Sequence, residues 1–212
     1  MDLETIRSQL DIYRDAGLKA LVTSSFQTHS IPMLHLLQQC WPGLSIYFLD
    51  TGYHFPETLT FRDEVVELLD LNLRIVKGLE DKTRSPLYVV SESSCCAINK
   101  VDPLTPHLVD HDVWISGVRA DQTSTRQTFD TTTGGPHNTQ RYHPMLRWTQ
   151  DDIDAYRAQY NLPEHPLDAL GYRSIGCVPC TAVPTETDSY GRTGRWPSSE
   201  KTECGLHLAR QP

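Results

Sequence analysis

Short apolar runs alternate with helix-like segments through the first half of this chain, and this alternation constrains the fold more than any other feature. The runs predict strands at 18–23, 44–49, 73–76 and 113–116, the first of them suited to a buried position. Strands that alternate with helices form right-handed crossovers and a mostly parallel sheet. The sequence therefore predicts an α/β fold of three layers, in which helices cover both faces of a twisted, mostly parallel sheet.

The predicted helices are recognised by apolar residues at helical spacing and by residues that start or end a helix. One spans 3–16 before Gly17, one begins near Ser30 with Pro32 in its first turn, and one begins at Pro56. Thr149 and Asp152 form a capping box for a further helix that ends near Asn161. The expected buried faces are Leu3, Ile6, Leu10 and Tyr13; Met33, Leu34, Leu36, Leu37 and Cys40; Phe61, Val65, Leu68 and Leu69; and Ile153, Tyr156 and Tyr160.

Polar residues follow three of the predicted strands. Ser24 and Ser25 follow the first, 50–52 (Asp-Thr-Gly) the second, and 117–119 (Gly-Val-Arg) the fourth. Ligands of parallel sheets bind at the carboxyl ends of the strands. A serine-rich turn before a helix N-terminus also suits a phosphate, although such serines often serve only as caps. The coincidence of three polar strand ends predicts a nucleotide site.

Two later segments lack any helical or strand period. Residues 120–137 are polar and are predicted to form a loop, in which Arg126 closes over an anion. Residues 185–199 are rich in Gly, Pro, Ser and Thr, which predicts a linker or lid. We therefore divide the chain into a body, residues 1–184, and a mobile C-terminal tail, residues 185–212.

Size and charge restrict the class of protein. A chain of 212 residues can bury the core of one ordinary domain. A net charge of −8 argues against a general nucleic-acid binder. No apolar run approaches the roughly 20 residues of a membrane span, and the N-terminus lacks a secretory signal. We expect a cytoplasmic protein that binds neither nucleic acid nor membrane; the sequence is compatible with a homo-oligomer but does not decide the oligomeric state.

In a reducing compartment the six cysteines are expected to be metal ligands or reactive thiols. Cys40 lies among apolar residues and is expected to be buried. Four of the others form two pairs, Cys95-Cys96 and Cys177-x-x-Cys180. Directly adjacent cysteines can both reach one zinc ion only with strain, whereas an iron–sulfur cluster offers each thiolate its own iron. The spacing favours a four-iron cluster, with zinc or a reversible Cys177–Cys180 disulfide as alternatives. Cys204 is then the cysteine left free.

Three cysteine motifs resemble the signatures of the assimilatory adenylyl-sulfate reductases. They are Cys95-Cys96-Ala97-Ile98-Asn99-Lys100-Val101-Asp102-Pro103-Leu104, Gly176-Cys177-Val178-Pro179-Cys180-Thr181 and Lys201-Thr202-Glu203-Cys204-Gly205-Leu206-His207. The stretches 24–27 (Ser-Ser-Phe-Gln), 49–52 (Leu-Asp-Thr-Gly) and 114–122 resemble the nucleotide-binding segments of the same family. The likeness runs in order from about residue 20 to residue 207, and it implies an adenine nucleotide α-hydrolase-like fold.

The resemblance also implies a cofactor and a reaction. One 4Fe–4S cluster would bind Cys95, Cys96, Cys177 and Cys180 and support the site without relaying electrons, with Lys100 between cluster and substrate. Cys204 would attack the sulfur of adenylyl sulfate, release AMP and become a cysteine S-sulfonate, from which thioredoxin or glutaredoxin releases sulfite. Because no thioredoxin-like domain follows residue 212, we expect the reductant to be a separate protein.

A cysteine nucleophile needs nearby cations, since a free thiol is mostly protonated at neutral pH. The candidates, which would also hold the phosphosulfate, are Lys100, Arg119, Arg126, Arg192 and Arg195. Ser24, Ser25 and Thr51 are expected beside the nucleotide. His207 is expected to orient or shield the thiol, although a solvent-exposed terminal histidine fits the sequence equally.

The chain departs from the family pattern at three places. Asn99 stands where many relatives have arginine, residues 197–199 (Pro-Ser-Ser) lack the usual aromatic run, and the loop 24–27 resembles that of the 3′-phospho enzymes, which have no cluster. One alternative is therefore a 3′-phosphoadenylyl-sulfate or dual-specificity reductase. Another is a zinc-binding nucleotide module without catalysis. A third is an ATP-dependent enzyme of tRNA sulfur transfer. Such an enzyme would need a Ser-Gly-Gly-x-Asp-Ser loop, which residues 24–30 do not provide, and a more basic surface.

Overall fold

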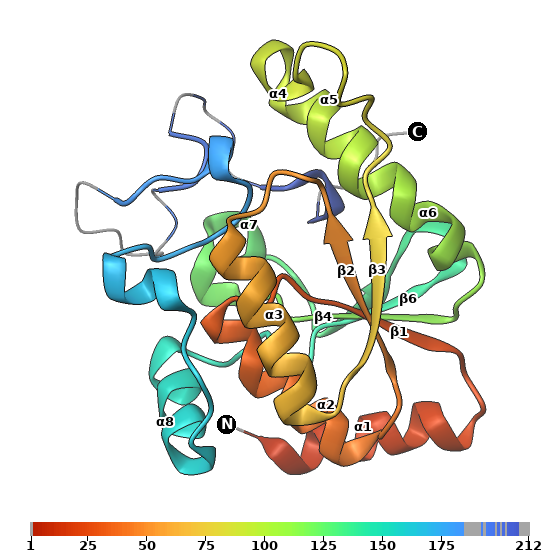
Figure 1. Ribbon diagram of the computed structural model, residues 1–212. Coiled ribbons are helices and arrows are strands. Elements are labelled where there is room, and N and C mark those ends of the chain that lie inside the picture. The colour runs from red at the N-terminus through yellow and green to blue at the C-terminus, as the bar shows by residue number, and fades with distance from the viewer. Residues whose placement is uncertain are drawn as a thin grey trace.

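The computed structural model describes residues 2–184, 192, 194–197, 199, 201 and 203–207, with only the backbone of His207. Six strands form one sheet in the order β3-β2-β1-β4-β6-β5 (Figure 1). Their bounds are β1 Ala20–Thr23, β2 Ser45–Asp50, β3 Asn72–Lys77, β4 Val113–Ser116, β5 Thr132–Gly134 and β6 Gln140–Tyr142. Only the β5–β6 pair is antiparallel, so the predicted mostly parallel sheet is confirmed.

Eight α-helices connect and cover the strands in the described part of the chain. They are α1 Leu3–Asp15, α2 Ile31–Cys40, α3 Pro56–Leu69, α4 Leu87–Val90, α5 Glu92–Cys96, α6 Asp102–Val109, α7 Ser124–Gln127 and α8 Gln150–Tyr160. A π-helical turn, Ala97–Val101, joins α5 to α6. Among the described residues, no helix combines the length and apolar character that crossing a membrane requires.

Alternate residues of each strand face opposite sides of the sheet, and each side has its own core. Val22 of β1 and Ile115 of β4 belong to the larger core, which α1, α2, α3 and α8 cover. Leu21 and Trp114 belong to the smaller one, where α6 contributes Leu104 and Leu108. Helices on both faces make the three predicted layers (Figure 1).

The predicted helix boundaries agree with the structure where capping residues mark them. Gly17, directly after α1, has a φ of +69°, a left-handed value that glycine adopts without strain. Pro32 lies in the first turn of α2, and Pro56 begins α3. The Thr149–Asp152 capping box is present, and Asn161 ends α8 in the left-handed conformation. The expected inward residues Ile6, Leu10, Tyr13, Ile153 and Tyr156 are buried.

Three predictions about individual segments are wrong. Leu68 is 61 % exposed, because α3 buries the face of Thr58, Phe61 and Val65 and Leu68 lies off that face. Cys40, at the last position of α2, is only partly buried. The polar segment 120–137 is not a plain loop, since it contains α7 and strand β5, which pairs with β6 at the edge of the sheet. Exposed edge strands need no apolar alternation, so their sequences lack the usual signal.

The predicted mobile tail, residues 185–212, lies largely outside the described residues. Its described C-terminal part, Glu203 to His207, returns to the body and ends in a 3₁₀ turn, Gly205–His207. In Figure 1 the dark blue segment lies next to the arrowhead of β2, at the carboxyl ends of the parallel strands. The tail therefore approaches the edge of the sheet at which the sequence predicts the ligand site.

Candidate active site

A pocket opens at the carboxyl ends of β1, β2 and β4. β1 is the central strand here, with β2 on one side and β4 on the other, so the loops that follow these strands diverge and leave a crevice. The strand ends contribute Thr23, Ser24, Ser25, Phe48, Leu49, Ser116, Gly117 and Val118. Later segments contribute Lys100, Arg126, Ile175, Gly176, Arg192, Arg195, Trp196, Cys204 and Leu206. Seven of the predicted site residues line this one pocket, namely Ser24, Ser25, Lys100, Arg126, Arg192, Arg195 and Cys204.

The loop after β1 is held in shape by its own side chains. Ser24 Oγ accepts a hydrogen bond of 3.1 Å from the Phe26 amide, and Phe26 takes a left-handed φ of +54°. Gln27 Nε2 donates to Ser25 Oγ at 2.9 Å, while Gln27 Oε1 accepts from the Ile175 amide at 2.6 Å. Gln27, which sequence reasoning did not single out, therefore joins this loop to the segment that precedes Cys177.

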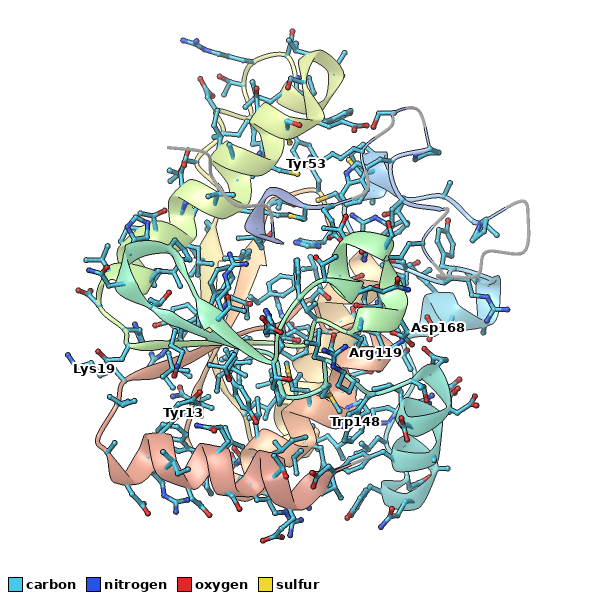
Figure 2. The ribbon with its side chains drawn as sticks, turned by 180° about the vertical axis from the view of Figure 1, so that it is seen from behind. Tyr13, Lys19, Tyr53, Arg119, Trp148 and Asp168 are labelled. Atoms are coloured by element: carbon cyan, nitrogen blue, oxygen red, sulfur yellow. The ribbon has the colours of Figure 1, made fainter. Side chains whose placement is uncertain are left out.

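The four paired cysteines are buried and free. Cys177, Cys180 and Trp196 pack together, with Tyr53 (labelled in Figure 2) and Cys204 against them. Thr51 Oγ1 lies 3.2 Å from Cys177 Sγ. Burial raises the pKa of Cys95, and burial with the neighbouring Cys177 raises the pKa of Cys180 to about 11. Thiols in such a place are weak acids and keep their protons unless a metal replaces them.

No three His, Cys, Asp or Glu side chains among the described residues are grouped so that they could hold one metal ion. A zinc site needs three or four ligands that meet at one ion. The thiolates of a four-iron cluster need not converge in this way, because each bonds to a different iron. Four buried sulfurs in two pairs therefore fit the donor set of a cluster.

Cys204 lies beside Cys96 at the wall of the pocket. The hydrogen bond with Cys96 is the largest influence that lowers the pKa of Cys204, and the charges of Lys100 and Arg195 and the Leu206 amide act in the same direction against burial. The same hydrogen bond raises the pKa of Cys96. The cysteine that the sequence leaves free of the two pairs therefore lies in contact with one of the paired cysteines, Cys96.

Lys100 lines the pocket from the π-helical turn that follows Cys96. Burial alone lowers the pKa of Lys100, but the negative charges of Cys177, Cys204 and Cys96 outweigh burial and raise it. The ammonium group therefore stays charged among these sulfurs. This position agrees with the expectation that Lys100 stands between the paired cysteines and a ligand in the pocket.

Arg192 and Arg195 approach the pocket from the described part of the tail, at the rim formed by Trp196. Arg195 Nε donates to the Cys180 carbonyl at 3.2 Å, and its guanidinium carbon lies 4.6 Å from the centre of the Trp196 ring. Arg192 Nε is buried and has no hydrogen-bond partner among the described atoms. Burial and the charge of Arg126 lower the pKa of Arg192 to about 9. An anion bound in the pocket would accept a hydrogen bond from Arg192 Nε and would stabilise its positive charge.

Arg126 and Arg119, the other two predicted anion-binding arginines, are engaged by carboxylates. Arg126 pairs with Glu203. Arg119, labelled in Figure 2, is 4 % exposed and binds Asp121 through Nε at 2.9 Å and Nη2 at 3.1 Å. Arg119 is not among the pocket-lining residues, because its side chain turns back towards Asp121 and Gln150. Thr51 likewise lies at Cys177 rather than in the pocket.

Glu203 is a site residue that sequence reasoning did not select. Its side chain is 1 % exposed. Although burial raises the pKa of Glu203, the hydrogen bonds and charge of Arg126 outweigh burial and keep it below the usual value. His207, which was expected to orient the thiol, has only its backbone described, and its side chain lies outside the described part.

Asn99 is fully buried, and its contacts explain why a basic residue is not needed there. Asn99 Nδ2 donates to Glu80 Oε2 at 2.7 Å and lies 3.4 Å from Cys95 Sγ. Glu80 also accepts from Tyr53 Oη at 2.9 Å and Lys82 Nζ at 2.6 Å. The buried carboxylate is therefore neutralised by Lys82, and Asn99 links it to the first cysteine pair.

The fold and the polar strand ends define an adenine nucleotide α-hydrolase-like protein, and comparisons agree. A phosphoadenylyl-sulfate reductase from Candida auris, solved as a phosphate complex, matches with a TM-score of 0.68 at 18 % identity, covering 85 % of this chain and 96 % of that one. The FMN adenylyltransferase of Candida glabrata matches with a TM-score of 0.64 at 17 % identity, over 85 % of this chain and 64 % of that one. These likenesses establish the fold alone.

Sequence comparisons establish the family. Residues 19–183 match the model of the phosphoadenosine phosphosulfate reductase domain. An adenosine 5′-phosphosulfate reductase from Salinibacter ruber is 36 % identical over 88 % of this chain and 77 % of its own length, and one from Streptomyces coelicolor 35 % over 97 % and 87 %. A phosphoadenosine 5′-phosphosulfate reductase from Gloeobacter violaceus is 36 % identical over 90 % and 83 %. The chain belongs to the phosphoadenosine phosphosulfate reductase family, as the cysteine motifs indicated.

Proposed function

We propose that this protein reduces adenylyl sulfate to sulfite and AMP, with Cys204 as the nucleophile. The observation that carries the proposal is the position of the Cys204 thiol at the wall of the strand-end pocket, among Lys100, Arg192 and Arg195. Several relatives at 35–38 % identity are named adenosine 5′-phosphosulfate reductases, which supports the same activity. We also propose that the body, residues 1–184, holds the nucleotide and that a mobile tail, residues 185–212, presents Cys204.

In the first step the Cys204 thiolate attacks the sulfur of the sulfate group. A sulfur–sulfur bond forms, the bond between that sulfur and the bridging oxygen breaks, and AMP leaves with the electron pair. Charge builds up on the leaving phosphate and the transferred sulfonate, so the cations Lys100, Arg192 and Arg195 stabilise the transition state. Ser24 and Ser25 line the pocket, and α2 begins after Ser30, which also lines it; we assign the phosphate of AMP to these serines and this helix N-terminus.

In the second step a thiolate of thioredoxin or glutaredoxin attacks the sulfur of Cys204, and sulfite leaves. The second thiol of that reductant then breaks the mixed disulfide, which restores the Cys204 thiol and oxidises the reductant. The net change is a two-electron reduction of the sulfonate sulfur. Because the pocket is enclosed by residues of the tail, the second step requires Cys204 to become accessible to another protein.

We propose that Cys95, Cys96, Cys177 and Cys180 hold one 4Fe–4S cluster. Four free, buried sulfurs in two pairs support this, as does the positive charge of Lys100 beside them. A bound cluster would supply a fixed, compact anchor for the segments that carry Lys100 and Arg195, and we assign it no step in the reaction. If Cys96 bound iron, it would no longer have a proton to donate to Cys204. The charges of Lys100 and Arg195 would then remain to stabilise the Cys204 thiolate.

The test is mass spectrometry of the protein mixed with adenylyl sulfate and no reductant. We expect a sulfonate adduct on the peptide that contains Cys204, and its release as sulfite on addition of reduced thioredoxin. An adduct on another cysteine, or none, would refute the proposal. Turnover of adenylyl sulfate and its 3′-phosphorylated form should be compared in the same preparation, because a strong preference for the second would favour the alternative substrate.

A further inference from the structure

The residues on both sides of Cys204 are fixed to the body of the protein. Before it, Arg126 Nε and Nη2 donate to the two carboxylate oxygens of Glu203 at 2.7 and 2.8 Å. After it, Arg141 Nη2 donates to the Leu206 carbonyl at 2.7 Å. The short segment that carries the thiol is therefore held at two points, one of which is a buried ion pair.

The Glu203 contact is specific rather than a general attraction of charges. Two parallel hydrogen bonds from one guanidinium fix the carboxylate in position and in orientation. Thr123 Oγ1 donates a third bond, of 2.8 Å, and Arg192 Nη2 lies 3.9 Å from the same group. Thr123 is the N-cap of α7 and Arg126 lies within α7, so one short element carries both main partners, and both of these residues are buried.

Arg126 is committed to this contact. Its third nitrogen, Nη1, donates to Gln122 Oε1, so each nitrogen of the guanidinium already has a partner within the protein. Arg192, in contrast, has a buried Nε without a partner among the described atoms. The structure thus separates two uses of arginine at the pocket: Arg126 holds the tail, whereas Arg192 is available for an anion.

We infer that Glu203 is a positioning residue, whose carboxylate, bound by Arg126 and Thr123, holds the Cys204 thiol at the substrate pocket. This inference rests on the proposed function, since it assigns Glu203 a role in the step that sulfonates Cys204. It also reassigns Arg126 from binding the substrate to fixing the tail. If the carboxylate only stabilised the fold, its removal would lower the free energy of unfolding. It would not slow the sulfonation of Cys204 while leaving the affinity for the nucleotide unchanged.

The experiment measures the single-turnover rate of Cys204 sulfonation at saturating adenylyl sulfate, together with the dissociation constant for AMP. Glu203→Gln keeps the size of the side chain but removes its charge. We expect the sulfonation rate to fall at least ~10-fold, because small displacements of a reacting atom are costly, while AMP affinity changes less than ~2-fold. Glu164→Gln, which removes the surface ion pair with Arg157 of 2.7 Å, is the matched control and should match the wild type.

The double variant R126Q/E203Q separates loss of the contact from the effect of an unpaired buried charge. If the contact positions Cys204, the double variant should be as slow as E203Q. Recovery of the wild-type rate in the double variant, or an unchanged rate in E203Q, would overturn the inference. If E203Q does not fold, the sulfonation rate of the double variant is compared with that of the wild type instead. If the wild type itself acquires no sulfonate on Cys204, the proposed function fails; if the wild type and E203Q react equally, only the inference fails.

Discussion

The guanidinium of Arg195 occupies the space that a side chain on Gly176 would fill. A Cβ built at Gly176 would overlap the end of the Arg195 side chain, at a position whose φ is not left-handed. The requirement for glycine here is therefore steric, and it comes from a residue in the tail. The glycine before Cys177 leaves room for an arginine that the proposed mechanism places on the substrate.

We therefore predict that Gly176→Ala moves Arg195 away from the pocket. A flexible side chain can yield at little cost in stability, so the KM for adenylyl sulfate should rise roughly 10-fold, the loss of one charge-assisted contact, with an unfolding midpoint near that of the wild type. Gly134→Ala is the control, because a methyl group there meets no atom within 4 Å. An unchanged KM in Gly176→Ala would show that Arg195 does not bind the substrate.

Cys204→Ser is predicted to abolish sulfite formation and the sulfonate adduct, because a serine hydroxyl is too weak a nucleophile at neutral pH. Iron content and AMP binding should be retained, since the serine is nearly the same size. Mass spectrometry, iron analysis and calorimetry with AMP measure the three properties. Sulfite formation at the normal rate in this variant would mean that the nucleophile is another residue.

Cys95→Ala and Cys180→Ala are predicted to lose iron together with activity, because a four-iron cluster with three protein ligands is held less tightly. The matched control is Cys40→Ala, since Cys40 lies at the end of α2 and packs against the larger core. Anaerobically purified proteins should be compared by iron analysis and visible absorbance. Full iron content in Cys95→Ala, or stoichiometric zinc in the wild type, would contradict the proposed cofactor.

The stability of the protein is predicted to fall as the pH drops from about 6.5 towards 4. Burial lowers the pKa of His143 and of His165 to about 4. His165 Nδ1 accepts from the Leu167 amide at 3.2 Å and Nε2 lies 3.0 Å from Thr58 Oγ1, so the neutral ring is the one that fits. The folded state binds fewer protons than the unfolded state below pH 6.5, and stability present above that pH is lost below it.

At pH 5 each of these histidines should cost roughly 1–2 kcal/mol of unfolding free energy relative to pH 8. Urea unfolding at a series of pH values measures the effect. His165→Gln, whose amide can still bond to Thr58, should make the profile less steep. A stability that stays constant between pH 8 and pH 5 would show that these rings are not neutral in the folded state.

The sequence predicted the parts of the site that lie next to a regular element in the chain. Ser24 and Gly117 follow apolar strands directly, and topology alone brings the ends of parallel neighbours together. The cysteine pairs and Lys100 were identified by spacing and by family resemblance. In both cases the signal lies within a few consecutive residues.

The remaining features depend on contacts between polar residues far apart in the chain. Glu203 meets Arg126 across 77 positions, and Asn99 meets Glu80 across 19. A single acid or amide has no period and no motif that names its partner, so the burial of these residues could not be predicted from the sequence. For the same reason Arg119, which directly follows a strand as predicted, points to Asp121 rather than into the pocket.

The pairing of β1 with β4 determines the stage of folding at which the ligand site can form. Val22 pairs with Ile115 across 93 positions of the chain, and the pocket opens at the carboxyl ends of these two strands. Contacts between such distant segments form late, because a long loop must close before they can contribute. A nucleotide should therefore bind only after β1 and β4 have paired, so that the appearance of AMP binding marks the completion of the sheet and not an early intermediate.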